Sequence, residues 1–172
     1  MDFYELIRGR ESIRNYDPEK PVPDDTLNRI LEAGRLAPSA VNAQPWRFLV
    51  ITSPEMLARV RPCYGRNWFS DAPHVLVVVG NVDEAWVREA DGYNSIETDL
   101  TIAMDHMILA AEYEGVGTCW IEAYDPFKLR EALSLKDNEK IFSITPLGYP
   151  KKGFEKKRSK KRKEPGEVVE FL

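Results

Sequence analysis

The sequence has few of the residues that assign many chains to a class at once. Its 172 residues include only two cysteines and two histidines. Two cysteines are too few for the disulfide framework of a small secreted protein, and although they could form one bridge, we expect both to be reduced. His74 and His106 lie far apart and have no cysteine or carboxylate at metal-binding spacing. A zinc site or a catalytic triad is therefore not predicted, and we expect His74 at the start of a strand and His106 on a packed helix.

Long apolar runs and nucleotide-binding loops are also missing. The strongest apolar run, Val75 to Gly80, is far too short to cross a bilayer, and residues 1–5 lack the basic-then-apolar pattern of a signal peptide. We therefore expect a soluble cytoplasmic protein. No glycine-rich loop ends in Gly-Lys-Ser/Thr, and Gly115 and Gly117 lack the third glycine and the preceding strand of a dinucleotide-binding turn. Phosphate-loop and Rossmann-type folds are not predicted.

The composition and charge of the chain suit a single compact domain over residues 1–172. It is 43% hydrophobic, 10% aromatic and 30% charged. Residues 151–163 hold nine Lys/Arg against Glu155 alone, and because the whole chain carries −4, this +8 segment leaves −12 on the other residues. An acidic body would repel a nucleic-acid backbone, so nucleic acid is the least favoured partner. A smaller anion is the expected ligand of the basic segment.

Helix and strand patterns alternate along the chain. Helical spacing of apolar residues predicts helices over 24–37 and 96–111, and the Ser53-Pro54 and Asp125-Pro126 pairs predict the starts of two more. Strands are predicted over 46–52, 75–80, 118–121 and 141–147, with 75–80 central because it is apolar on both faces. We expect an α+β fold, a three-layer α/β/α sandwich around a mixed, mainly antiparallel sheet.

Two polar segments are candidates for ligand binding. Residues 8–14 place three arginines and Ser12 within seven positions, a density suited to gripping phosphate or carboxylate, although an exposed helix end would look the same. Residues 37–48 form a proline-bounded stretch in which Asn42 and Gln44 offer both donors and acceptors. Such amides could read the carbonyl and N–H edge of a flat heterocycle, whereas in an ordinary loop they would bond their own backbone.

Together these segments resemble the FMN-dependent nitroreductase family. The resemblance rests on Arg-x-Ser-x-Arg at 10–14, Ala-Pro-Ser-x-x-Asn-x-Gln-Pro-Trp-x-Phe at 37–48, Gly-Val-Gly-Thr-Cys-Trp-Ile at 115–121, Pro-Leu-Gly-Tyr-Pro at 146–150 and the basic residues 160–163. The order and spacing of these motifs extend over nearly the whole chain. It looks like a short member of the family, without the long inserted helices of larger flavin reductases.

The resemblance implies a homodimer with two FMN sites, each built from both subunits. It implies that the FMN phosphate would be held by Arg10, Glu11, Ser12, Lys160 and Arg162, with Arg14 close by. The partner subunit would border the flavin ring with Pro38, Ser39, Ala40, Asn42 and Gln44. Trp120, Ile121, Glu122 and Ala123 would pass beside the ring with a backbone N–H near its N5 atom, and Asn67 would contact the pyrimidine side. Residues 151–172 would close on the phosphate and the partner, and Asp99 would be structural.

The activity implied by the resemblance is hydride transfer from NADH or NADPH to FMN and then to an electron-poor small molecule, such as a nitroaromatic, a quinone or free flavin. A ping-pong mechanism follows, because both substrates would use the same flavin face. No catalytic acid, base or metal is required. Two alternatives stay open: a flavin-binding carrier or sensor without turnover, and a specialised activity such as reductive dehalogenation.

Overall fold

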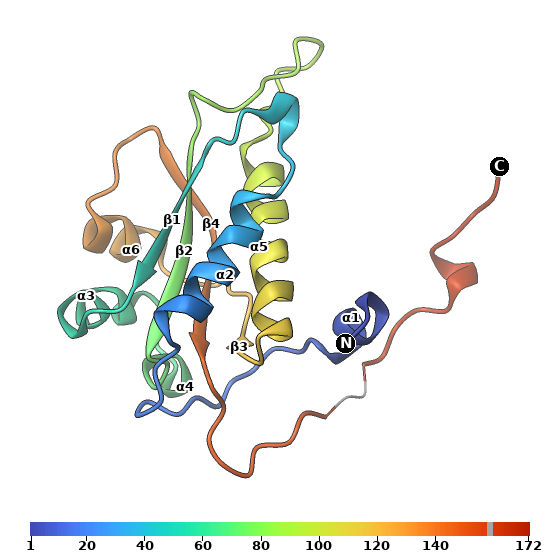
Figure 1. Ribbon diagram of the computed structural model, residues 1–172. Coiled ribbons are helices and arrows are strands. Elements are labelled where there is room, and N and C mark those ends of the chain that lie inside the picture. The colour runs from blue at the N-terminus through green and yellow to red at the C-terminus, as the bar shows by residue number, and fades with distance from the viewer. Residues whose placement is uncertain (158–159) are drawn as a thin grey trace.

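The computed structural model describes residues 1–157 and 160–172. The protein is built on a four-stranded sheet (Figure 1). The strands are β1 (Trp46–Ile51), β2 (His74–Asn81), β3 (Gly117–Thr118) and β4 (Glu139–Gly148). Their order across the sheet is β1-β2-β4-β3, and every neighbouring pair is antiparallel. The α+β expectation is confirmed, but the expected mixed sheet is corrected. Parallel pairing occurs only as a single bridge between Ser12 and Thr118 in the described part of the chain.

Helices cover both faces of this sheet, which gives three layers. On one face α2 (Asp24–Arg35) and α5 (Ile96–Tyr113) pack on alternate residues of β2, including Leu76 and Val78. On the other face α3 (Pro54–Val60), α4 (Asn67–Ser70) and α6 (Pro126–Leu133) pack on Val75, Val77 and Val79. Because β2 lies between two apolar cores, its sequence is apolar on both faces rather than alternating. The central position predicted for this strand is confirmed.

The helix boundaries follow from local sequence signals. Ser53 accepts a hydrogen bond from the backbone N–H of Met56 at 3.2 Å, and Asp125 accepts from the N–H groups of Phe127 and Lys128 at 3.1 Å. Both caps stand immediately before a proline at the first helical position, as predicted. Gly115, with a φ of 74°, follows the end of α5 in the left-handed conformation that glycine adopts freely.

The two ends of the chain leave the body together (Figure 1). The first helix, α1 (Phe3–Gly9), was not among the predicted elements, although Asp2 and Glu5 form a reciprocal capping box at its start. It buries none of its residues. The C-terminal segment runs past α1 and ends beyond the short 3₁₀ turn Pro165–Glu167. No helix within residues 1–157 and 160–172 is long and apolar enough to cross a membrane.

Candidate functional site

Positive side chains from opposite ends of the chain meet beside α1. The ammonium group of Lys160 donates to the carbonyl of Ile7 at 3.1 Å, and the backbone N–H of Lys157 donates to the Glu11 carboxylate at 3.1 Å. Partial burial and the neighbouring charges of Arg10 and Arg162 lower the pKa of Lys160. Three cations close enough to repel one another are the arrangement expected where an anion binds. The family resemblance implies that these three residues hold a phosphate, and the structure brings them together.

The residues after Arg10 run along the end of β3. The backbone N–H of Ile13 donates to the carbonyl of Thr118 at 2.7 Å, and Ser12 forms the parallel bridge with the same residue. Burial raises the pKa of the Cys119 thiol, whereas the adjacent Arg14 and Ser12 side chains lower it. Ser12 and Arg14 therefore lie next to Cys119, the residue before Trp120. This placement is expected if residues 10–14 and 120–123 contribute to the same site.

The segment from Trp120 to Ala123 is fixed by the sheet at one residue and exposed at the next two. Ile121 exchanges both of its backbone hydrogen bonds with Ile144, each at 3.0 Å, so its N–H is already engaged. The backbone N–H groups of Glu122 and Ala123 make no hydrogen bond to a described residue, and both residues are exposed. The backbone N–H of Trp120 also lacks a partner among the described residues, but Glu122 and Ala123 are the exposed residues with such donors. The Glu122 carboxylate accepts from the indole N–H of Trp120 at 2.6 Å, which gives it a local partner.

Helix α4 completes this end of the molecule. The guanidinium carbon of Arg14 lies 5.9 Å from the ring centroid of Trp68, within range of a cation–π contact. Asn67, the exposed first residue of α4, precedes that tryptophan. Contacts within a single chain thus link residues 10–14 to Trp68, to residues 118–119 and to residues 160–162.

The polar loop of residues 38–44 lies elsewhere. It follows α2 and is tied to the first turn of α5 by a hydrogen bond of 2.9 Å from the Ala40 N–H to the Asp99 carboxylate. The cation cluster and Thr118 lie beyond the other end of this 18-residue helix, which is about 27 Å long at 1.5 Å per residue (Figure 1). A single chain therefore does not bring Pro38, Ser39, Ala40, Asn42 and Gln44 to its own cation cluster or to Thr118.

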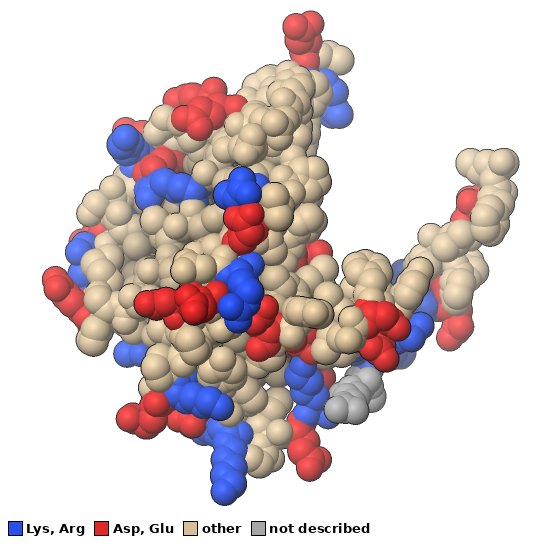
Figure 2. All heavy atoms as spheres, viewed as in Figure 1, with Lys and Arg blue, Asp and Glu red and all other residues tan. Residues whose placement is uncertain are grey.

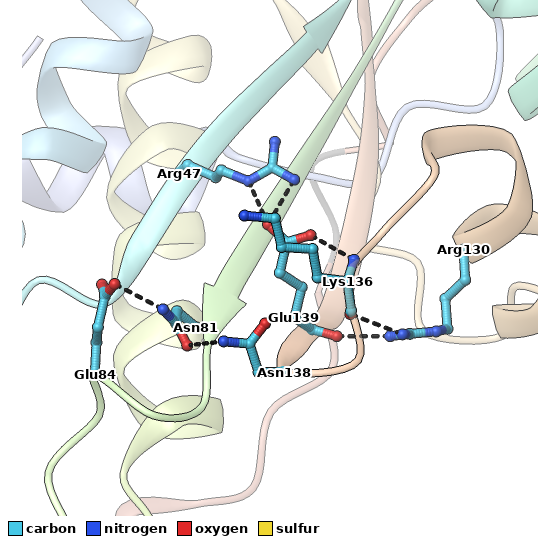
Figure 3. A network of polar contacts seen from close by, with 7 residues as sticks. All are labelled: Arg47, Asn81, Glu84, Arg130, Lys136, Asn138 and Glu139. Atoms are coloured by element: carbon cyan, nitrogen blue, oxygen red, sulfur yellow. Dashed lines mark hydrogen bonds and ion pairs between the residues drawn. The ribbon is translucent and has the colours of Figure 1, made fainter.

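A second polar cluster borders a groove of about 460 Å³ next to the start of β1 (Figure 3). Its central carboxylate, Glu139, accepts from Arg47 Nε at 2.8 Å and from the Lys136 N–H at 2.8 Å. These bonds lower the pKa of Glu139. Arg130 donates to the carbonyls of residues 139 and 136 at 2.6 and 2.9 Å. Both carboxylate oxygens are engaged, so this network fastens the turn before β4 to the sheet.

Groups of histidine, cysteine and acidic side chains that could hold a metal ion are absent from residues 1–157 and 160–172. Both cysteines are free and buried in the part of the chain that the structure describes. Sequence reasoning missed the contacts that fasten the C-terminal segment, above all the ion pair of Lys156 with Glu112 on α5. A lysine inside a basic run and a glutamate in the last turn of a helix carry no signal that they will pair.

Comparison with known proteins gives a consistent result. The nitroreductase family model matches residues 7–64 and 61–149. A protein from Methanothermobacter thermautotrophicus, described as a candidate NADH dehydrogenase/NAD(P)H nitroreductase, is 33% identical over 162 residues, 87% of this chain and 78% of the relative.

Two solved structures extend the comparison to three dimensions. A crystal structure of a nitroreductase family protein from Clostridium difficile 630 superimposes with a TM-score of 0.92 at 32% identity, covering 99% of this chain and 98% of the other. An FMN-dependent nitroreductase from Clostridium difficile R20291 superimposes with a TM-score of 0.81 at 25% identity, covering 98% of both chains. The chain belongs to the nitroreductase family.

Proposed function

We propose that this chain is an FMN-dependent NAD(P)H oxidoreductase that reduces an electron-poor small molecule, such as a nitroaromatic, a quinone or free flavin. The observation that carries the proposal is that Arg10, Lys160 and Arg162 come together from opposite ends of the sequence, in a chain that also leaves the backbone N–H groups of residues 122 and 123 without a described partner. A phosphate needs the first group of contacts, and a flavin ring needs the second.

The cation cluster fits the phosphate of FMN. Arg10 and Arg162 can each present two parallel N–H groups to phosphate oxygens, and Lys160 adds a point charge. Ser12 adds a hydroxyl donor, and Glu11 holds the C-terminal segment in place through the backbone of Lys157. Partial burial first, and then repulsion from Arg10 and Arg162, lower the pKa of Lys160; a bound dianion would offset the repulsion.

The segment after β3 fits the flavin ring. FMN, when bound, takes up hydride from NAD(P)H and passes it to the acceptor. The N–H groups of Glu122 and Ala123 can donate to a ring nitrogen, and the pairing of Ile121 with Ile144 keeps this backbone rigid. Trp120 holds the Glu122 carboxylate, so that charge need not face the ring.

The position of the loop 38–44 supports a homodimer with shared sites. Asn42 and Gln44 cannot reach the cation cluster of their own chain, because α5 separates them, but a second copy could supply them. The first helix and the chain end also expose apolar surface, with Phe3 61%, Tyr4 63% and Phe171 96% exposed. Residues 151–172 would then close on the phosphate and cover the partner, with residues 158 and 159 outside the described part of this segment.

A steady-state assay with added FMN tests the proposed function. Purified protein should oxidise NADH or NADPH in the presence of a quinone or a nitroaromatic compound. Initial rates at varied donor and acceptor concentrations should give parallel double-reciprocal lines, because both flat substrates must occupy the same flavin face in turn. Stoichiometric FMN binding without turnover would instead identify a carrier or sensor, and intersecting lines would contradict the ping-pong mechanism.

A further inference from the structure

Asp99 is a buried carboxylate that joins helix α5 to the polar loop of residues 38–44. Its residue is 1% exposed and lies in the first turn of α5. One carboxylate oxygen accepts from the Ala40 N–H at 2.9 Å, and the other accepts from the Ser95 hydroxyl at 2.7 Å. No lysine or arginine among the described residues forms an ion pair with it. Burying a carboxylate is costly unless its oxygens are hydrogen-bonded, and here both oxygens are used to hold neighbouring groups.

The loop that Asp99 holds has a strained backbone. Val41, Asn42 and Gln44 have φ angles of 47°, 58° and 51°, in the left-handed region that residues other than glycine rarely adopt. Val41 is β-branched and 75% exposed, so burial of its side chain does not compensate for the strain. A conformation of this kind persists only where surrounding contacts impose it.

Bonds inside the loop help to hold this conformation, and Asp99 connects the loop to the helical layer. Inside the loop, Gln44 N–H donates to the Ser39 hydroxyl at 2.9 Å, a bond that would move with the loop. Among the hydrogen bonds of the described residues, the one from Ala40 to Asp99 ties residues 39–44 to the helical layer. Ser95 is itself fixed, because its N–H donates to the carbonyl of Trp86 at 2.9 Å. The hydrogen bond from Ser95 therefore fixes the orientation of the Asp99 carboxylate that accepts from Ala40.

We propose that Asp99 is a positioning residue for the flavin ring. Through Ala40 it keeps the loop in the strained form that presents Asn42 and Gln44 to the ring in the partner's site. This inference rests on the proposed function. It gives the buried carboxylate in the first turn of α5 a role in ligand binding. Asp99 supports binding of the flavin ring through the loop, whereas Arg10 binds the phosphate.

Flavin titrations of the full-length protein test this separation. Binding of FMN and of riboflavin, which lacks the phosphate, is measured by fluorescence for wild type, Asp99→Ala, Asp99→Asn and Asp105→Ala. The Asp99→Ala variant should bind both flavins about tenfold more weakly, since a hydrogen bond to a charged group is lost. The Asp99→Asn variant keeps an oxygen acceptor for Ala40 and should stay within about threefold of wild type. Asp105, exposed on the same helix, is the matched control and should leave both affinities unchanged.

The outcomes distinguish this proposal from the proposed function. If wild type binds no FMN, the function assigned above fails. If wild type binds FMN but Asp99→Ala binds both flavins equally well, or loses FMN alone, the positioning role is wrong. An Asn variant as impaired as the Ala variant contradicts it too. Should Asp99→Ala not fold, Ser95→Ala decides: it should weaken FMN and riboflavin by the same factor, and wild-type affinity for both would overturn the proposal.

Discussion

Arg10 lies where the start of the chain meets its basic C-terminal segment, next to Lys160. If this group binds phosphate, Arg10→Ala should weaken FMN binding by about 1.5–3 kcal/mol, the usual range for a hydrogen bond to a charged group. Riboflavin affinity should change little, because the lost contact is to the phosphate. Calorimetric titration measures both, with Arg59→Ala on α3 as a control at an exposed arginine outside the site. Unchanged FMN affinity in both Arg10→Ala and Arg162→Ala would remove the phosphate assignment.

His74 makes the stability of the fold depend on pH. Its Nε2 atom accepts from the Val22 N–H at 3.0 Å, and burial lowers the pKa of this histidine below 6.5. The unfolded chain therefore binds a proton more readily than the folded chain, so the free energy of unfolding should decrease as the pH falls below about 6.5.

Urea unfolding at about pH 7.5 and about pH 5.5 measures this effect. The His74→Gln variant should lose the part of the pH dependence that comes from the imidazole, whereas His106→Gln should keep it. Equal pH dependence in wild type and His74→Gln would show that other groups govern it.

Several site residues could be predicted from the sequence because the motifs are local. The arginines and serine of residues 10–14, and the amides of Asn42 and Gln44, stand out through composition and spacing alone. The role of Asp99 could not be found in this way, because it depends on a contact between residues 59 positions apart. The pairing of Ser12 with Thr118 could not be predicted from the sequence either, because the tertiary fold sets it.

At the scale of elements, the packing of α2 on α5 depends on a glycine. A Cβ atom at Gly34 would lie 2.7 Å from both Cγ and Sδ of Met107, which is fully buried. Overpacking of this kind costs typically about 1–3 kcal/mol, so Gly34→Ala should lower the free energy of unfolding by that amount. Gly65→Ala, where nothing lies within 4 Å, should stay within about 0.5 kcal/mol of wild type. Equal stability of the two variants in urea unfolding would contradict this account of the interface.

The elements with a strong apolar periodicity were predictable, and the short elements without one were not. Strand β2 (His74–Asn81) and the long helix α5 (Ile96–Tyr113) lie where the apolar pattern predicts them. The four-residue helix α4 and the seven-residue helix α1 are too short to show a periodic apolar pattern, although a capping box marks the start of α1. The sheet is antiparallel rather than mixed, because strand direction depends on how connections cross the sheet and not on the strands themselves.

At the scale of the whole molecule, charge and apolar surface are unevenly placed. Figure 2 shows basic side chains, among acidic ones, along the lower edge of the molecule and at the base of the arm that the C-terminal segment forms. Uncharged atoms dominate the outer end of this arm. The C-terminal apolar residues of this arm, Val168, Val169, Phe171 and Leu172, are all more than half exposed. A monomer in water would gain by covering this surface, and a second copy can do so while supplying residues 38–44.

The most direct test of the shared flavin site is a subunit-mixing experiment. Arg10→Ala and Asn42→Ala proteins, each expected to bind FMN weakly, are mixed under conditions of subunit exchange and titrated with FMN. In each heterodimer one site combines an intact Arg10 with an intact Asn42, so about a quarter of all sites should recover wild-type affinity after random exchange. No recovery after demonstrated exchange, or a flavin-loaded monomer in light scattering, would contradict the shared site.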